Sequence, residues 1–403
     1  MSASGNRAVE RINPKMTSIF EVTFWVCIAF VFYTYFAYPI AIAAVARLRP
    51  RRVRHAGRCP KSVSIVLAVY NEANLVSRRL KELIALLAAS NAEGEIVVVS
   101  DGSTDETAEQ ARQFSSRGVR VLELPVNVGK AAALTQACAS TRNEIVVFAD
   151  ARQRWSPTAL DALLKNFADP EVGGVSGDLV LEKNDGVLAG VGLYWKYERW
   201  LRRNECLVGS AIGVTGAICA VRRELFRPIP PRTILDDVYW PLQVVLQGFR
   251  VVRDPRALAY DRLPNSARDE YRRKVRTLAG NYQLLLSIPS ALLPWRNPIW
   301  LQFVSHKVFR LLVPWTMLIA FASSALLAGT IYQIAFVGQI ALYLVGLLGI
   351  FSQGAARQRG VSVAASFLIL NTAAAAAAWV CMSGRANLAW KKVQHASADA
   401  DAK

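Results

Sequence analysis

The apolar residues of this chain gather in long runs near its two ends, and this distribution constrains the fold more than any other feature. One run covers residues 17–46, and three more lie near 308–329, 331–351 and 361–383. Each run has at least the roughly 20 residues that a helix needs to cross a bilayer. The sequence therefore predicts a membrane protein in which a water-soluble domain separates the first span from three later ones within 308–383.

Arginines predict the orientation of this protein in the membrane. The first run is followed by a basic linker, 47–60, with the sequence "RLRPRRVRHAGR" at its start. The positive-inside rule places this linker and the following domain in the cytoplasm and the N-terminal tail, 1–16, outside. The run is too long for the core of a signal peptide, and no clear cleavage site follows it. We therefore expect a multi-pass protein of the cell (inner or plasma) membrane with a cytoplasmic domain.

The side of the membrane that holds the polar C-terminal tail, 384–403, stays open. Arg357 and Arg359 predict that the loop before the last run is cytoplasmic, so a fourth span would carry the tail outside. The tail itself contains basic residues that favour the cytoplasm, among them Arg385 and Lys391.

Residues 291–307 precede the second span and mix aromatic with basic side chains, including Trp300, Phe303, His306 and Lys307. This mixture is typical of an amphipathic helix that lies in the membrane interface. A solvated helix start would explain the same pattern.

The net charge of +18 is compatible with nucleic acid, anionic lipid or a polyphosphate substrate as a partner. The six cysteines are scattered, with no C-x-x-C pair and no neighbouring histidine. They therefore predict neither a zinc site nor a disulfide framework, and a reducing compartment suits the middle domain.

The middle domain, 61–290, alternates short apolar runs with helical patterns. The runs "VSIVLAV", "EIVVVS", "VRVLEL" and "EIVVFAD" have the length and continuous apolarity of buried parallel strands. Helical patterns lie between them, near 73–90, 104–115 and 129–140. Repeated βαβ units predict a doubly wound parallel α/β sheet whose ligands bind at the carboxyl ends of the strands.

Polar residues stand at four of these strand ends. Tyr70 and Glu72 follow the first strand, Asp101 ends the second, Lys130 opens the helix after the third, and Asp150 ends the fourth. Ordinary helix-start chemistry could explain any one of them, as in the "DGST" sequence at Asp101. Four in order at one edge of a sheet instead predict a binding site.

As a set, these motifs resemble the catalytic domain of membrane-bound family 2 glycosyltransferases. That family has the GT-A fold and includes cellulose, hyaluronan, chitin and poly-N-acetylglucosamine synthases. The resemblance implies that Tyr70, Glu72 and Asp101 bind the nucleoside of a nucleotide sugar, usually UDP-linked. It also implies that Lys130 lies near the nucleotide.

Asp150 matches the first aspartate of the D-x-D motif of the family, which holds Mg²⁺ or Mn²⁺ together with the diphosphate. Arg152 stands where the second aspartate would be. One carboxylate is chemically sufficient, because Mg²⁺ usually fills its shell with phosphate and water. Arg152 either pairs with the diphosphate directly or points away, and both interpretations stay open.

Asp236 and Asp237 stand ahead of a helical run, where simple capping would also explain them. The resemblance implies that Asp237 is the general base, and the adjacent acid would raise its pKa. It also implies that the glycine-containing segment "GVTGA" forms the floor of the acceptor site.

Residues 271–283 fall where polymerising relatives carry a Q-x-x-R-W motif. Arg276 keeps the arginine, whereas Arg273 replaces the glutamine and Thr277 the tryptophan. Arg273 and Arg276 can still contact the diphosphate. The departure leaves the addition of many sugars or of one sugar as open alternatives.

The resemblance implies an inverting transferase that moves a sugar from a nucleotide-sugar donor to a growing polysaccharide. The alternative adds one sugar to a polyprenyl-phosphate-linked or glycolipid acceptor. Membrane lipids are expected partners. Nucleic acid is not an expected partner, because nucleic-acid binding would not explain the acidic residues at the strand ends. A transporter is disfavoured because transporters carry charged or broken spans, whereas these runs are almost free of charge.

Overall fold

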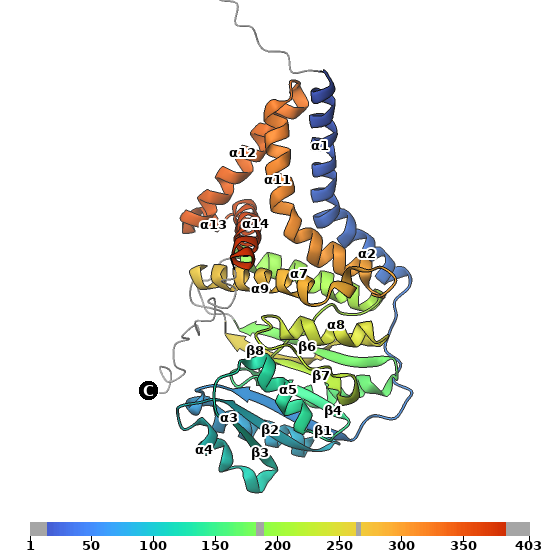
Figure 1. The fold of residues 1–403 in the computed structure, drawn as a ribbon, viewed down its shortest axis with the longest axis vertical. Coiled ribbons are helices and arrows are strands. Elements are labelled where there is room, and N and C mark those ends of the chain that lie inside the picture. The colour runs from blue at the N-terminus through green and yellow to red at the C-terminus, as the bar shows by residue number, and fades with distance from the viewer. Residues whose placement is uncertain (1–13, 183–188, 263–266, 384–403) are drawn as a thin grey trace, which may run out of the picture.

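The computed structural model describes residues 14–182, 189–262 and 267–383. An α/β domain occupies one end of the molecule and long apolar helices occupy the other (Figure 1). Between these two parts, helices α7 and α9 of the domain run across the long axis of the molecule.

Within the described residues, the domain contains one eight-stranded sheet with the order β3-β2-β1-β4-β7-β6-β8-β5. Its strands are β1 (Ser62–Val69), β2 (Glu93–Asp101), β3 (Val119–Leu124), β4 (Ile145–Ala149), β5 (Arg154–Trp155), β6 (Val172–Glu182), β7 (Ile218–Arg222) and β8 (Arg250–Arg262). The first four strands are parallel, as their continuous apolar runs predict. Strand β7 pairs antiparallel with β4 and with β6, so the complete sheet is mixed.

The alternation of side chains along β1 shows why the sheet is covered on both faces. Val66 belongs to one apolar cluster, together with Phe148 and Trp240, whereas Ile65 and Leu67 belong to a second. Successive residues of a strand point to opposite faces, so a run without polar breaks must be buried on both sides.

In the described part of the chain, six helices of the domain lie between these strands in the sequence, and a seventh follows the last strand. They are α3 (Ala73–Ala89), α4 (Thr107–Arg112), α5 (Lys130–Ser140), α6 (Ala159–Lys165), α7 (Ala189–Val208), α8 (Asp236–Leu246) and α9 (Ala267–Ser287). The predicted βαβ alternation through the first four strands is therefore confirmed, and the fold class is α/β.

Four helices in the described residues are long and apolar enough to cross a membrane: Met16–Leu48, Trp300–Leu326, Thr330–Phe351 and Arg359–Met382. The first consists of α1 (Pro14–Phe32), the π-helical turn η1 (Tyr33–Ala37) and α2 (Tyr38–Leu48). The second consists of α10 (Trp300–Phe303), the π-helical turn η6 (Val304–Val308) and α11 (Phe309–Leu326). The last two are α12 (Thr330–Phe351) and α14 (Arg359–Met382), joined by α13 (Gln353–Ala356).

Residues 291–307 differ from the single interface helix that the sequence predicts. A 3₁₀ turn ends at Leu292, and α10 begins only at Trp300 before continuing through η6 into α11. Pro294 and Pro298 explain the irregular stretch, because proline lacks the amide hydrogen that a helix interior needs. His306 is buried, so this segment is not a solvated helix start either.

Candidate active site

A small pocket lies at the carboxyl end of β4, where the sequence predicts a site. It is lined by residues from α5, the end of β4, α8, and β7 with the segment before it. These are Lys130, Leu134, Phe148, Ala149, Asp150, Gly216, Cys219, Asp236, Asp237 and Trp240. The structure therefore brings four of the predicted site residues together: Lys130, Asp150, Asp236 and Asp237.

Lys130 is the cation at the centre of this group. Its Nζ lies 2.8 Å from Asp150 Oδ1 and 3.9 Å from Asp236 Oδ2. Burial lowers the pKa of Lys130, but the neighbouring carboxylates of Asp150, Asp236 and Asp237 outweigh it and raise this pKa above its ordinary value. The lysine therefore stays protonated.

Asp237 has the electrostatic surroundings of a general base. Burial and the adjacent charge of Asp236 raise its pKa to about 6, although Lys130 opposes the shift. A carboxylate with such a pKa accepts a proton near neutral pH better than an ordinary one does.

The "GVTGA" segment packs directly against Asp237. The Val214 amide donates to the Asp237 carbonyl at 2.8 Å. A Cβ built on Gly216 would lie 3.6 Å from Asp237 Cβ and 3.8 Å from Lys130 Nζ. The absence of a side chain at Gly216 thus keeps the space above Asp237 open.

Trp155 supports the "GVTGA" segment through a hydrogen bond to Ala217. Sequence reasoning did not identify Trp155 as a residue of the site. Its indole Nε1 donates to the Ala217 carbonyl at 3.0 Å, and its amide donates to Glu82 at 2.6 Å. The buried guanidinium of Arg79 lies 4.8 Å from the indole ring and pairs with Glu82 at 2.9 Å. No local motif reveals these partners, which come from α3, β5 and the segment before β7.

Asp101 lies outside the pocket lining. Its two carboxylate oxygens accept from the amides of Val128 at 2.8 Å and Gly129 at 2.9 Å. Gly129 has φ +89°, a conformation that favours glycine, and the next residue is Lys130. In the structure, Asp101 therefore positions the turn that presents Lys130.

Tyr70 and Glu72 stand at the end of β1, next to the end of β2. The Glu72 amide donates to Thr107 Oγ1 at 2.8 Å, and the Thr104 amide donates to Asn71 Oδ1 at 2.9 Å. These bonds hold the two strand ends side by side. Neither Tyr70 nor Glu72 lines the pocket.

Arg152 pairs with a carboxylate that the sequence did not single out. It donates to Asp261 Oδ2 at 2.7 Å, and Gln153 donates to the same oxygen at 2.9 Å. Of the two interpretations left open, the structure favours the one in which Arg152 points away from the pocket. Asp261 lies on β8, too far along the chain for a local pattern to connect the two.

Arg273 and Arg276 are exposed residues of α9 outside the pocket lining. Helix α9 nevertheless packs against the segment that leads to Asp236. A Cβ on Gly280 would lie 2.6 Å from Leu235 Cγ, and the Ile234 amide donates to Gln283 Oε1 at 2.9 Å. The structure thus gives this helix a supporting position beside the two aspartates.

Comparison with known proteins agrees with this geometry. The model of "Glycosyl transferase family 2" matches residues 64–229. The poly-beta-1,6-N-acetyl-D-glucosamine synthase of Staphylococcus epidermidis is 24% identical over 233 residues, which cover 56% of this chain and 56% of the relative. The synthase of the same name from Staphylococcus aureus (strain MSSA476) is 23% identical over 241 residues, with the same coverage. The chain therefore spans about half the length of the curated relatives it matches.

A solved structure covers more of the chain. The mannosyltransferase PcManGT from Pyrobaculum calidifontis, in complex with GDP-Man and Mn²⁺, superposes with a TM-score of 0.64 at 20% identity. The match covers 90% of this chain and 99% of that one, and it shows the fold alone. With its mixed sheet of the GT-A type, the chain contains a family 2 glycosyltransferase domain.

Proposed function

We propose that this chain is a membrane-embedded inverting glycosyltransferase that moves a sugar from a UDP-linked donor to a growing polysaccharide. The observation that carries the proposal is the grouping of Lys130, Asp150, Asp236 and Asp237 at one edge of the sheet. The polymer as product is supported by the similarity to poly-N-acetylglucosamine synthases.

The charge of the pocket supports a divalent cation as cofactor. One lysine faces three aspartates there, a net charge of −2 when all are ionised, which disfavours an anionic diphosphate. The described residues contain no group of three or more metal-ligating side chains. One or two carboxylates suffice when phosphate completes the coordination shell. Asp150 and Asp236 therefore fit Mg²⁺ or Mn²⁺ that arrives with the donor, and the bound cation would neutralise the leaving diphosphate.

Two residues of the chain carry out the remaining steps, which are stabilisation of the leaving group and removal of the proton. Lys130 holds a fixed positive charge where the diphosphate gains negative charge. Asp237 accepts the proton of the acceptor hydroxyl, which enters the space that Gly216 leaves open. Attack from the face opposite the leaving group inverts the anomeric centre.

A second candidate adds one sugar to a lipid-linked acceptor. The observation in its favour is Thr277, which stands where polymerising relatives carry tryptophan, on a helix whose Arg273 and Arg276 do not line the pocket. The similarity to named polymer synthases favours the first candidate.

Activity of the purified full chain in lipid nanodiscs tests the proposal. Radiolabelled UDP-sugars and GDP-mannose are supplied singly with Mg²⁺ or Mn²⁺, and the product is sized. We expect a metal-dependent ladder of products from one UDP-sugar, absent in Asp237→Asn. Products that carry only one added sugar would favour the second candidate function over polymer synthesis. Transfer only from GDP-mannose would overturn the UDP assignment.

We also propose that the domain lies on the cytoplasmic face of the cell membrane. The basic linker between the first span and the domain supports this side.

A further inference from the structure

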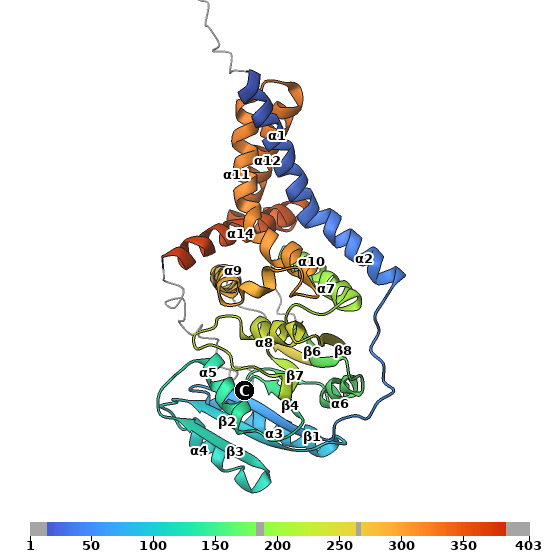
Figure 2. The same cartoon turned by 45° about the vertical axis from the view of Figure 1, so that its right-hand side comes forward.

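We propose that α14 lies along the cytoplasmic surface of the membrane instead of crossing it, and that its outward face contacts the interfacial layer of lipid. The inference rests on the cytoplasmic placement of the domain proposed above. The length and apolarity of α14 make it a candidate span. Its direction differs from that of the other candidates, because it runs across the long axis that α1 and α11 follow (Figures 1 and 2).

The packing partners of α14 come from both the glycosyltransferase domain and the membrane helices. The helix contacts α9 and α7, and it reaches the membrane helices α11 and α12. Its buried residues are small or polar: Ser362, Ala364, Ala365, Asn371, Ala373, Ala374, Ala377 and Ala378. Small side chains allow two helices to approach closely. A helix held in this way lies at the level of the domain surface, because α7 and α9 form that surface.

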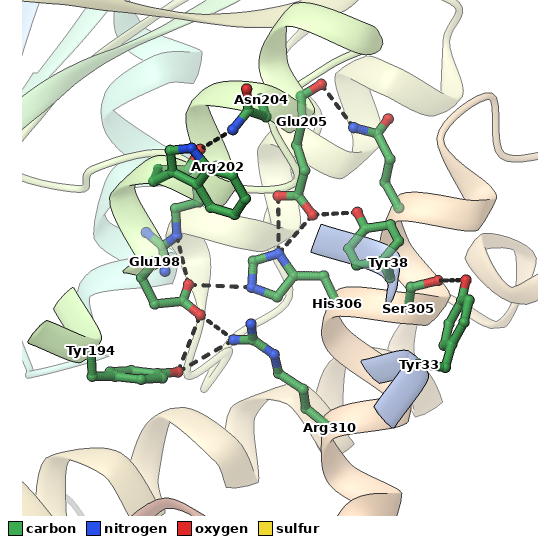
Figure 3. A network of polar contacts seen from close by, with 12 residues as sticks. Tyr33, Tyr38, Tyr194, Glu198, Arg202, Asn204, Glu205, Ser305, His306 and Arg310 are labelled. Atoms are coloured by element: carbon green, nitrogen blue, oxygen red, sulfur yellow. Dashed lines mark hydrogen bonds and ion pairs between the residues drawn. The ribbon is translucent and has the colours of Figure 1, made fainter. Parts of the chain in front are cut away.

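A buried charged cluster marks this level (Figure 3). Glu205 of α7 lies 2.8 Å from His306 Nδ1 and accepts from the Tyr38 hydroxyl at 2.6 Å. Glu198 of α7 lies 3.3 Å from His306 Nε2 and also pairs with Arg310. Charged groups are costly in the hydrocarbon core. The cluster therefore lies at the cytoplasmic boundary of the hydrocarbon core or on the cytoplasmic side of it.

Ring contacts connect α14 to the cluster. The guanidinium of Arg310 lies 5.9 Å from the ring of Tyr35, and that ring lies 5.3 Å from the ring of Phe367 in α14. Phe367 is near the middle of α14, where a crossing helix would pass through the centre of the bilayer. Here only the ring of Tyr35 separates Phe367 from the guanidinium of Arg310, which is the second residue of α11.

The basic residues around α14 agree with this position. Arg357 and Arg359 precede the body of the helix, and the sequence after it contains Arg385, Lys391 and Lys392. A crossing helix would place one of these groups outside, whereas a surface helix keeps both in the cytoplasm, as the positive-inside rule requires.

The outward face of α14 has the chemistry of a lipid contact. The residues Trp379 and Met382, three positions apart on this face, are 70% and 83% exposed in the chain by itself. Tryptophan is enriched where hydrocarbon meets the headgroups. The partner of this face is therefore the boundary between acyl chains and headgroups, with anionic headgroups attracted by the flanking basic residues.

The side of the C-terminus is tested first, in bacterial cells that express the full chain. Alkaline phosphatase fused after Lys403 should be inactive, and a green fluorescent protein there should be bright. The same phosphatase inserted at Gly329, between α11 and α12, should be active and serves as the control. Exposed Cys59 in the basic linker reports the side of the domain, and an impermeant maleimide should label it only after permeabilisation.

These outcomes separate the two proposals. Labelling of Cys59 in intact cells would overturn the cytoplasmic placement of the domain. Protected Cys59 together with an active C-terminal phosphatase would overturn the surface position of α14 alone.

The depth of α14 is tested with spin labels on the full chain in nanodiscs, at Thr372→Cys and Trp379→Cys. These positions are exposed and seven residues apart on one face. Leu344→Cys and Phe351→Cys on α12 have the same spacing and are the matched control. Seven residues advance about 10 Å along a helix, so Leu344 should be deeper than Phe351 by an amount of this order. Equal depths at Thr372 and Trp379 are expected, and the same step as on α12 would overturn the proposal.

Discussion

The Nζ of Lys130 lies 2.8 Å from the Oδ1 of Asp150, so the first residue of α5 is paired with the carboxylate at the end of β4. Both side chains are about one-third exposed, at 33% and 31%, so water screens part of the attraction between them. The importance of the pair is electrostatic, because it aligns a fixed cation and a carboxylate at the place where a charged donor would bind.

The Asp237→Asn variant should lose transfer while it keeps donor binding. An amide cannot accept the proton of the acceptor hydroxyl, and a general base contributes typically about 10²–10⁴-fold to a rate. Turnover is measured with radiolabelled donor and binding by calorimetry. Glu109→Gln, an exposed acid on α4, is the control and should behave as the parent protein. Full turnover in Asp237→Asn would show that Asp237 is not the general base.

The pH profile should report the same group. Asp237 must be ionised to accept a proton, and its pKa is raised to about 6. We therefore expect kcat/KM to increase with pH up to about 6 and to level off above it. A base with the ordinary value of 3.8 would place this limb about two pH units lower.

Stability should change with pH in the opposite direction. A folded-state pKa above the ordinary value means that the folded chain binds more protons than the unfolded one between about pH 4 and 6. The contribution of Asp237 to stability is therefore fully present below about pH 4 and decreases as the pH rises through 6. Thermal unfolding followed across this range should show a slope that Asp237→Asn removes, and an unchanged slope would contradict the raised pKa.

Removal of the Asp150 carboxylate should increase the metal concentration that donor binding requires. In Asp150→Ala, the Mn²⁺ concentration for half-maximal donor binding should increase by about tenfold or more, equivalent to about 1.4 kcal/mol. The affinity for donor without metal should change much less. Titration with Mn²⁺ at fixed donor measures the effect, and Glu109→Gln again is the control. A donor affinity that depended neither on Mn²⁺ nor on the residue at position 150 would contradict the proposed cation site.

Arg152 should act on structure and not on the donor. Because its guanidinium pairs with Asp261 at 2.7 Å, Arg152→Ala should lower the melting temperature and change the KM for donor by less than about threefold. Asp261→Asn should lower the melting temperature in the same way, since it removes the other half of the pair. An increase in donor KM of tenfold or more in Arg152→Ala alone would instead place this arginine on the diphosphate.

The amino-acid sequence determined the elements and the approximate location of the site. Continuous apolar runs such as residues 63–69 are typical of central strands that are buried on both faces, and the helical patterns between the first four runs favour a parallel arrangement. The carboxyl ends of such strands share one edge, and for this reason Lys130 and Asp150 could be expected together. The lengths of the apolar runs likewise fix which segments can enter a membrane.

Only the tertiary structure decided what the same residues contact. Asp261 is 109 positions away from Arg152, and no periodicity relates two residues at that distance. Asp101 carries the signature of a ligand-binding acid, yet its oxygens accept amide hydrogens from a turn whose path depends on the whole sheet. The direction of α14 depends on its packing against α9, since composition sets how apolar a helix is but not how it lies. Local hydrogen bonding and side-chain alternation are encoded in neighbouring residues, whereas these outcomes depend on contacts between distant segments.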